Sequence, residues 1–147
     1  MIRRALMILI VLAGFVPLSG VCEGSAKVDY ELQERCGKQA DEFFKREYGK
    51  SGVFNTEDGQ AIAGYRNHYN KKLNKCFFLL TYQDLPYKTK KNPSSTVRTL
   101  YDINENKEYG EFFQRLGDNH PTECKVSGKL CQSEKEWDAL ISPYMDE

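Results

Sequence analysis

The hydrophobic pattern of the chain is helical at first. Over residues 27–48, apolar side chains recur about every three to four positions, and Glu, Lys and Arg fill most of the others. This spacing predicts an amphipathic helix that ends before Gly49 and Gly52. Its buried face is expected to consist of Val28, Leu32, Cys36, Ala40, Phe43 and Phe44.

The pattern then changes to one that favours strands. The stretch "AIAGYRNHYNKKLNKCFFLLTYQ" predicts a hairpin with strands at 62–69 and 75–83 and a turn over 70–74. Alternation divides the second strand into two apolar faces, so we predict that it is central in the sheet. One face holds Cys76, Phe78, Leu80 and Tyr82, and the other holds Phe77 and Leu79.

A second hairpin follows the polar loop "DLPYKTKKNPSS". We expect strands at 97–103 and 108–114, joined by a turn over 104–107. Alternate residues of the first strand are expected to face inward, namely Val97, Thr99, Tyr101 and Ile103.

The last element is predicted to be a helix that begins after Ser133. The stretch "SEKEW" has the form of a capping box, with Glu136 three residues after Ser133. Pro143 is expected to end or bend this helix. Its apolar face consists of Trp137, Leu140, Ile141 and Tyr144. The predicted fold is therefore α+β, with an N-terminal helix, a four-stranded antiparallel sheet of two hairpins, and a C-terminal helix.

The N-terminus has the layout of a secretory signal peptide. Arg3 and Arg4 precede an apolar run over residues 5–16, and Pro17 follows it. The run is about a dozen residues long, shorter than the ~20 that a membrane-spanning helix needs. We therefore predict export by the Sec route, a periplasmic or extracellular location, and no transmembrane span after signal removal.

Three processing outcomes stay open, and they decide the fate of Cys22. Small residues permit cleavage after Gly20 or after Ala26. Alternatively, Cys22 is the acylated first residue of a lipoprotein, although Val21 stands where a small residue is preferred. We favour cleavage after Ala26, which makes residues 1–26 a signal peptide and residues 27–147 a single small domain.

The remaining four cysteines predict two disulfides, because an exported chain with an even cysteine number typically pairs them. We favour Cys36 with Cys76, which the first helix would bring together by packing on the Cys76 face. We favour Cys124 with Cys131, because Ser127 and Gly128 between them suit a turn. Zinc-type cysteine pairs are absent from the sequence, and His68 and His120 are not at metal spacing. We expect no metal and no cofactor.

The charge balance and the absence of known catalytic motifs exclude some classes of function without identifying one. Lys and Arg number 21, as do Asp and Glu, which argues against a general nucleic-acid binder. The sequence contains no nucleophile elbow, P-loop, His-Glu-x-x-His or dinucleotide glycine pattern. The candidate residues for contacting a partner lie in the first predicted hairpin and are Tyr65, His68, Tyr69, Lys71 and Lys72.

Three functional hypotheses follow. The first is a non-catalytic, exported binding or interaction module, a monomer whose partner is a protein or a small molecule. The second is a small secreted hydrolase that uses His68 with a carboxylate or a tyrosine. The third is a structural envelope protein, or a lipoprotein anchored at Cys22. Because a general base needs an orienting group and a target, and the sequence shows neither for His68, we favour the first.

Overall fold

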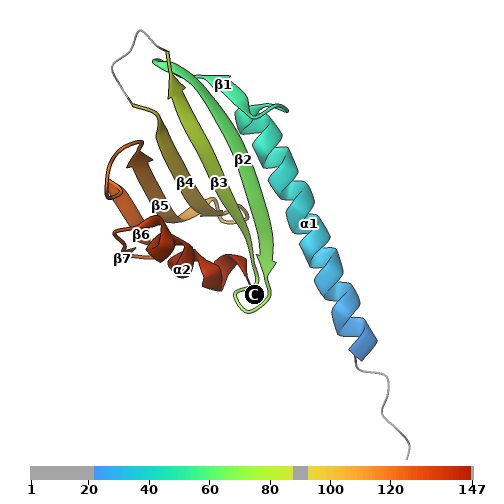
Figure 1. The fold of residues 1–147 in the computed structure, drawn as a ribbon. Helices are drawn as coiled ribbons and strands as arrows, with labels where there is room; N and C mark the ends of the chain where they lie inside the picture. The colour runs from blue at the N-terminus through green and yellow to red at the C-terminus, as the bar shows by residue number, and fades with distance from the viewer. Residues whose placement is uncertain (1–21, 88–92, 147) are drawn as a thin grey trace, which may run out of the picture.

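A computed structural model describes residues 22–87 and 93–146, with side chains from Lys27 onward. Residues 1–21 of the predicted signal peptide and the side chain of Cys22 lie outside these described residues. Two helices flank one antiparallel sheet in which each strand pairs with the next along the chain (Figure 1). The elements are α1 (Cys22–Tyr48), β1 (Val53–Asn55), β2 (Gly59–Asn70), β3 (Lys75–Pro86), β4 (Ser95–Asp102), β5 (Lys107–Arg115), β6 (Glu123–Val126), β7 (Lys129–Leu130) and α2 (Glu134–Met145).

The expected α+β class is confirmed, but the sheet has seven strands and not four. The three additional strands, β1, β6 and β7, contain 3, 4 and 2 residues. Strands this short show too few alternations to be recognised in a sequence, and they form by pairing with the edge of an adjacent strand. The Cys124–Cys131 bond closes the β6–β7 hairpin, whose turn lies at Ser127 and Gly128 as predicted, with φ values of 49° and 80°.

Asparagine and aspartate side chains form the two longer hairpin turns. In the β2–β3 turn, the backbone N–H of Leu73 donates to Oδ1 of Asn70 at 2.9 Å. In the β4–β5 turn, the N–H of Asn104 donates to Oδ1 of Asp102 at 3.0 Å. These bonds replace backbone pairing at the point where each strand reverses.

α1 packs on the sheet face that carries Phe78 and Leu80. The ring of Tyr65 lies between Phe44, at 4.7 Å between centroids, and Phe78, at 5.0 Å. The helix ends at Tyr48 as predicted, and Gly49 follows with a φ of 71°. The expectation that Val28 is buried is wrong: 53% of its surface is exposed, because the first turns of α1 extend beyond the sheet (Figure 1).

Both disulfides join the pairs that the sequence favours. Cys36 of α1 is bonded to Cys76 of β3, with 5.4 Å between their Cα atoms. Cys124 of β6 is bonded to Cys131, just after β7. The first bond fastens the N-terminal helix to the sheet, and the second closes the small C-terminal hairpin.

α2 packs on the opposite face of the sheet. Trp137 is fully buried and its ring lies 5.8 Å from that of Phe112. Gly110 makes room for this indole, since a Cβ at that position would lie 3.0 Å from it. The predicted cap is present: the N–H of Glu136 donates to Oγ of Ser133 at 3.2 Å. Pro143 does not end the helix, which continues to Met145.

β3 is buried on both faces, as predicted for a central strand. Phe78 faces α1 and Phe77 faces α2, and neither is exposed. β4 is also covered on the α2 side, where Leu100 is fully buried. No helix in the described part of the chain is both long and apolar enough to cross a membrane.

Candidate functional site

α2 covers only part of its sheet face. It lies near the end of the sheet that holds the β2–β3 turn, whereas the opposite ends of β3 and β4 extend past it (Figure 1). A groove of about 510 Å³ occupies the uncovered part of this face, within the range of roughly 300–1,000 Å³ typical of ligand sites. We treat this groove as the candidate functional site.

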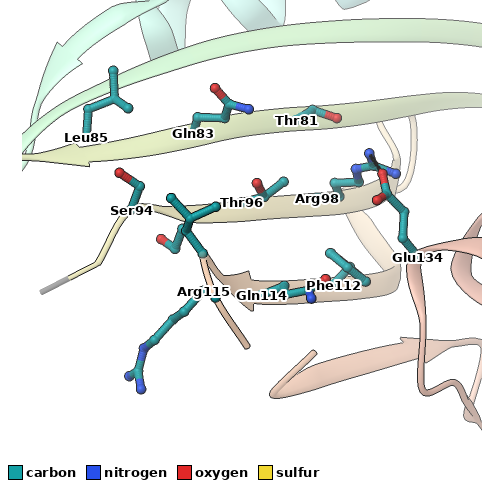
Figure 2. Close-up of a pocket in the computed structure, with 13 residues that line it drawn as sticks. Thr81, Gln83, Leu85, Ser94, Thr96, Arg98, Phe112, Gln114, Arg115 and Glu134 are labelled. Atoms are coloured by element: carbon teal, nitrogen blue, oxygen red, sulfur yellow. Dashed lines mark hydrogen bonds and ion pairs between the residues drawn. The ribbon is translucent and has the colours of Figure 1, made fainter. Parts of the chain in front are cut away.

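The strand register places the groove floor in two rows. Thr81, Arg98 and Phe112 lie opposite one another on β3, β4 and β5. Gln83, Thr96 and Gln114 form the next row (Figure 2). Because side chains alternate between faces, these residues share the face on which α2 packs. The floor is polar but has few charged groups.

An ion-pair cluster closes the end of the groove nearest α2. The two terminal nitrogens of Arg98 donate to Glu134 and, at 3.1 Å, to Asp138. The guanidinium carbon lies 5.7 Å from the ring centroid of Phe112, which is itself buried. The Nε of Arg98 is buried without a hydrogen-bond partner among the described residues. Arg98 therefore joins the groove floor to the first turn of α2 and is already neutralised by carboxylates.

Leucine side chains border the opposite, open end. Leu85 is 39% exposed and Leu116 is 76% exposed, and both line the groove. The N–H of Leu116 donates to the carbonyl of Ser94 at 2.7 Å, which holds the end of β5 beside the start of β4. This end of the site offers apolar surface to solvent.

Most of the polar floor is free to bind a ligand. Over the described residues, the side chains of Thr81, Gln83 and Thr96 form no hydrogen bond. Of the neutral polar side chains in the two floor rows, the amide of Gln114 is the one engaged within the described residues, since its Nε2 donates to the carbonyl of Asp118 at 2.9 Å. The free hydroxyl and amide groups can both donate and accept hydrogen bonds.

Two of the residues that the sequence singled out serve the α1 side of the sheet. Tyr65 stacks in the α1 core, and burial raises the pKa of its phenol. Tyr69 is 8% exposed, and its hydroxyl donates to Oδ1 of Asn74 at 2.6 Å. Both side chains have packing roles, and neither lines the groove.

The other three candidates lie near the β2–β3 turn and are not brought into one site. His68 is on the α2 side of the sheet, opposite Tyr65 and Tyr69, as alternation predicts. Lys71 forms a 2.6 Å ion pair with Asp29 of α1. Lys72 lines a second, open cavity of about 530 Å³ beside the C-terminal end of α2.

The geometry around His68 does not supply a partner for general-base chemistry at Nε2. This nitrogen is buried and has no hydrogen-bond partner among the described residues. A base of this kind is held by an orienting group and faces a target. The hydrolase hypothesis therefore gains no support from this nitrogen and stays a prediction.

Apart from Cys22, whose side chain is not described, the described part of the chain contains neither a metal-ligand cluster nor a free thiol. No group of three or more His, Cys, Asp or Glu side chains there is placed to hold a metal ion. Cys36, Cys76, Cys124 and Cys131 are all engaged in disulfides.

No protein-family model, no curated protein and no solved structure matches the chain.

Sequence reasoning missed the groove, although a signal was present. On β3, the face that begins with Phe77 and Leu79 continues with Thr81, Gln83 and Leu85. The change from apolar to polar at Thr81 marks the point where α2 no longer covers the strand.

Proposed function

We propose that the protein is an exported, non-catalytic binding module and that its partner binds in the groove over β3, β4 and β5. The observation that carries this proposal is the set of free hydrogen-bonding side chains, Thr81, Gln83 and Thr96, on the floor of a groove that has apolar residues at its open end. Binding sites typically combine apolar surface with a few convergent polar groups. This groove has both.

Export is supported by the covalent structure. Disulfides persist in oxidising compartments and are rare in reducing ones. The two bonds, Cys36–Cys76 and Cys124–Cys131, therefore fit a periplasmic or extracellular location.

A binding role is favoured over catalysis by the chemistry of the groove. Its titratable side chains include Arg98 and Glu134, which neutralise one another at one end. General acid–base catalysis needs a group whose protonation state can change near the working pH. Threonine and glutamine side chains cannot supply that change, but they bind neutral polar groups well.

The proposal is tested by capture with matched variants. Purified protein is immobilised and exposed to periplasmic extract and culture fluid of the source organism, and the retained molecules are identified by mass spectrometry. Thr96→Arg places a charged side chain on the groove floor, whereas Thr122→Arg makes the same change at an exposed position outside the groove. We expect a partner that is lost with Thr96→Arg and retained with Thr122→Arg.

A partner retained equally by both variants would show that binding occurs elsewhere on the molecule. Circular dichroism and the thermal midpoint of each variant establish that Thr96→Arg is folded before its loss of binding is interpreted.

A further inference from the structure

We propose that the groove binds an extended, uncharged segment of a protein chain, about four residues long, lying along the direction of β3 and β4. This inference rests on the proposed function, because it names the class of partner for the same site. It draws on the strand register, the charge of the groove, and the nature of its two ends.

The spacing of the floor matches an extended peptide. Thr81, Gln83 and Leu85 are successive same-face residues of β3, so their spacing along the strand is roughly 6.6–6.8 Å. Peptide groups that face one side of an extended chain repeat at the same interval, because that chain has the same rise per residue. Successive floor side chains can therefore meet successive backbone groups of a parallel or antiparallel ligand strand.

The length of the groove sets the length of the segment. From Thr81, beside the ion-pair cluster, to Leu85 at the open end, β3 advances four residues, or about 13 Å. An extended segment of about four residues covers the same distance. Hydroxyl and amide side chains suit its backbone, since each can donate to a carbonyl or accept from an N–H group.

The charges in the groove favour a neutral segment. Both terminal nitrogens of Arg98 are engaged by Glu134 and Asp138. Arg115 points away from the floor (Figure 2), and its guanidinium lies 5.7 Å from the ring centroid of Phe113. Among the described residues, no unpaired charge faces Gln83 and Thr96, so a charged ligand side chain placed over them would lose water without gaining an opposite charge there, which is unfavourable.

The two ends of the groove favour a peptide over a sugar or a nucleobase. Among the described residues that line the groove, the one aromatic residue is Phe112, which is 1% exposed, so these residues offer no ring face for stacking. Leu85 and Leu116 instead expose aliphatic surface at the open end. One aliphatic side chain at the end of the bound segment would cover them.

The experiment is a selection of random 12-residue peptides displayed on phage, using the purified exported protein as the target. Binding of synthetic versions of the enriched peptides is then measured by isothermal titration calorimetry. Gln83→Arg introduces a charge on the floor, and Gln132→Arg is its matched control at an exposed position outside the groove. Circular dichroism verifies that both variants are folded.

We expect enriched peptides to share an uncharged stretch of about four residues with an aliphatic member. Gln83→Arg should weaken their binding by at least about tenfold, and Gln132→Arg should leave it unchanged within about twofold. No enrichment, a consensus dominated by charge, or equal binding to the two variants would overturn the inference. If capture with Thr96→Arg nevertheless identifies a groove-dependent glycan or small molecule, the proposed function holds and only the peptide assignment fails.

Discussion

The two disulfides differ in the length of chain they close, and this difference predicts unequal contributions to stability. Cys36 and Cys76 are separated by 40 positions, whereas Cys124 and Cys131 are separated by 7. In the chain-entropy model, a cross-link stabilises the folded state by restricting the unfolded chain, and a longer loop restricts it more. The long loop is worth about 4 kcal/mol and the short one about 2.5 kcal/mol on this basis.

The perturbation replaces each pair with alanine, as Cys36→Ala with Cys76→Ala or as Cys124→Ala with Cys131→Ala. Alanine is preferred to serine, because Cys36 and Cys76 are only 2% and 1% exposed and a serine hydroxyl would be buried there. Removing both members of a pair leaves no partner thiol behind. For a domain of this size, the thermal midpoint should fall by about 15 °C without the first bond and about 10 °C without the second.

The assay is equilibrium unfolding in urea under non-reducing conditions, followed by fluorescence and circular dichroism so that two-state behaviour is verified. We also expect a larger denaturant slope for the first variant, because its unfolded state is less compact. If loss of the 124–131 bond lowers the unfolding free energy as much as loss of the 36–76 bond, loop length does not determine the contributions and the reasoning is wrong.

Three further predictions concern single side chains. Asp102 is fully buried and accepts a 2.6 Å bond from Lys75, so Asp102→Asn should lower the unfolding free energy by about 3 kcal/mol in urea titrations. The carboxylates of Asp102 and Glu105 raise the pKa of Lys75 in the folded protein. This shift stabilises the folded state fully below the pKa of lysine in the unfolded chain, about 10.4. The stabilisation is lost as pH rises through the higher pKa that Lys75 has in the folded state. The Lys75 contribution should therefore stay constant between about pH 7 and 9 in the same titrations, and a loss in that window would contradict the assignment. Ser133→Ala should cost about 1 kcal/mol by removing the helix cap, measured against wild type by thermal unfolding. Trp137→Ala should cost about 3–5 kcal/mol in calorimetry because the indole is fully buried, and a cost below about 1 kcal/mol would show that α2 is not essential to the core.

Long periodic segments were predictable from the sequence, because many residues repeat the same signal. The helix that ends at Tyr48 and the two faces of β3 follow directly from spacing. Val28 has the spacing of a buried residue but is exposed, because the periodicity of a helix does not show where the sheet that it packs against ends. The strands β1, β6 and β7 depend on neighbouring strands and carry no sufficient pattern of their own.

The candidate site was less predictable, because its parts come from distant segments. Arg98 and Glu134 are 36 positions apart, and no local spacing connects them. Thr81 and Gln83 were visible as polar members of an otherwise apolar face, but a strand pattern alone does not distinguish a binding floor from a solvated surface. That distinction requires knowing how far α2 reaches across the sheet.

The reach of α2 follows from elementary dimensions. Its 12 residues span about 18 Å, whereas the 12 residues of β3 span about 40 Å, so even a helix aligned with β3 would cover at most about half of it, and α2 runs across the strands (Figure 1). On β3, the residues beneath α2 are the buried Phe77 and Leu79, and the next two residues on that face are Thr81 and Gln83. A face maintained only for solubility is typically rich in lysine and glutamate, as the exposed side of α1 is. The uncovered floor instead carries neutral donors and acceptors that have no hydrogen-bond partner among the described residues. Such side chains suit a surface that a binding partner covers, because the partner can supply the missing hydrogen bonds.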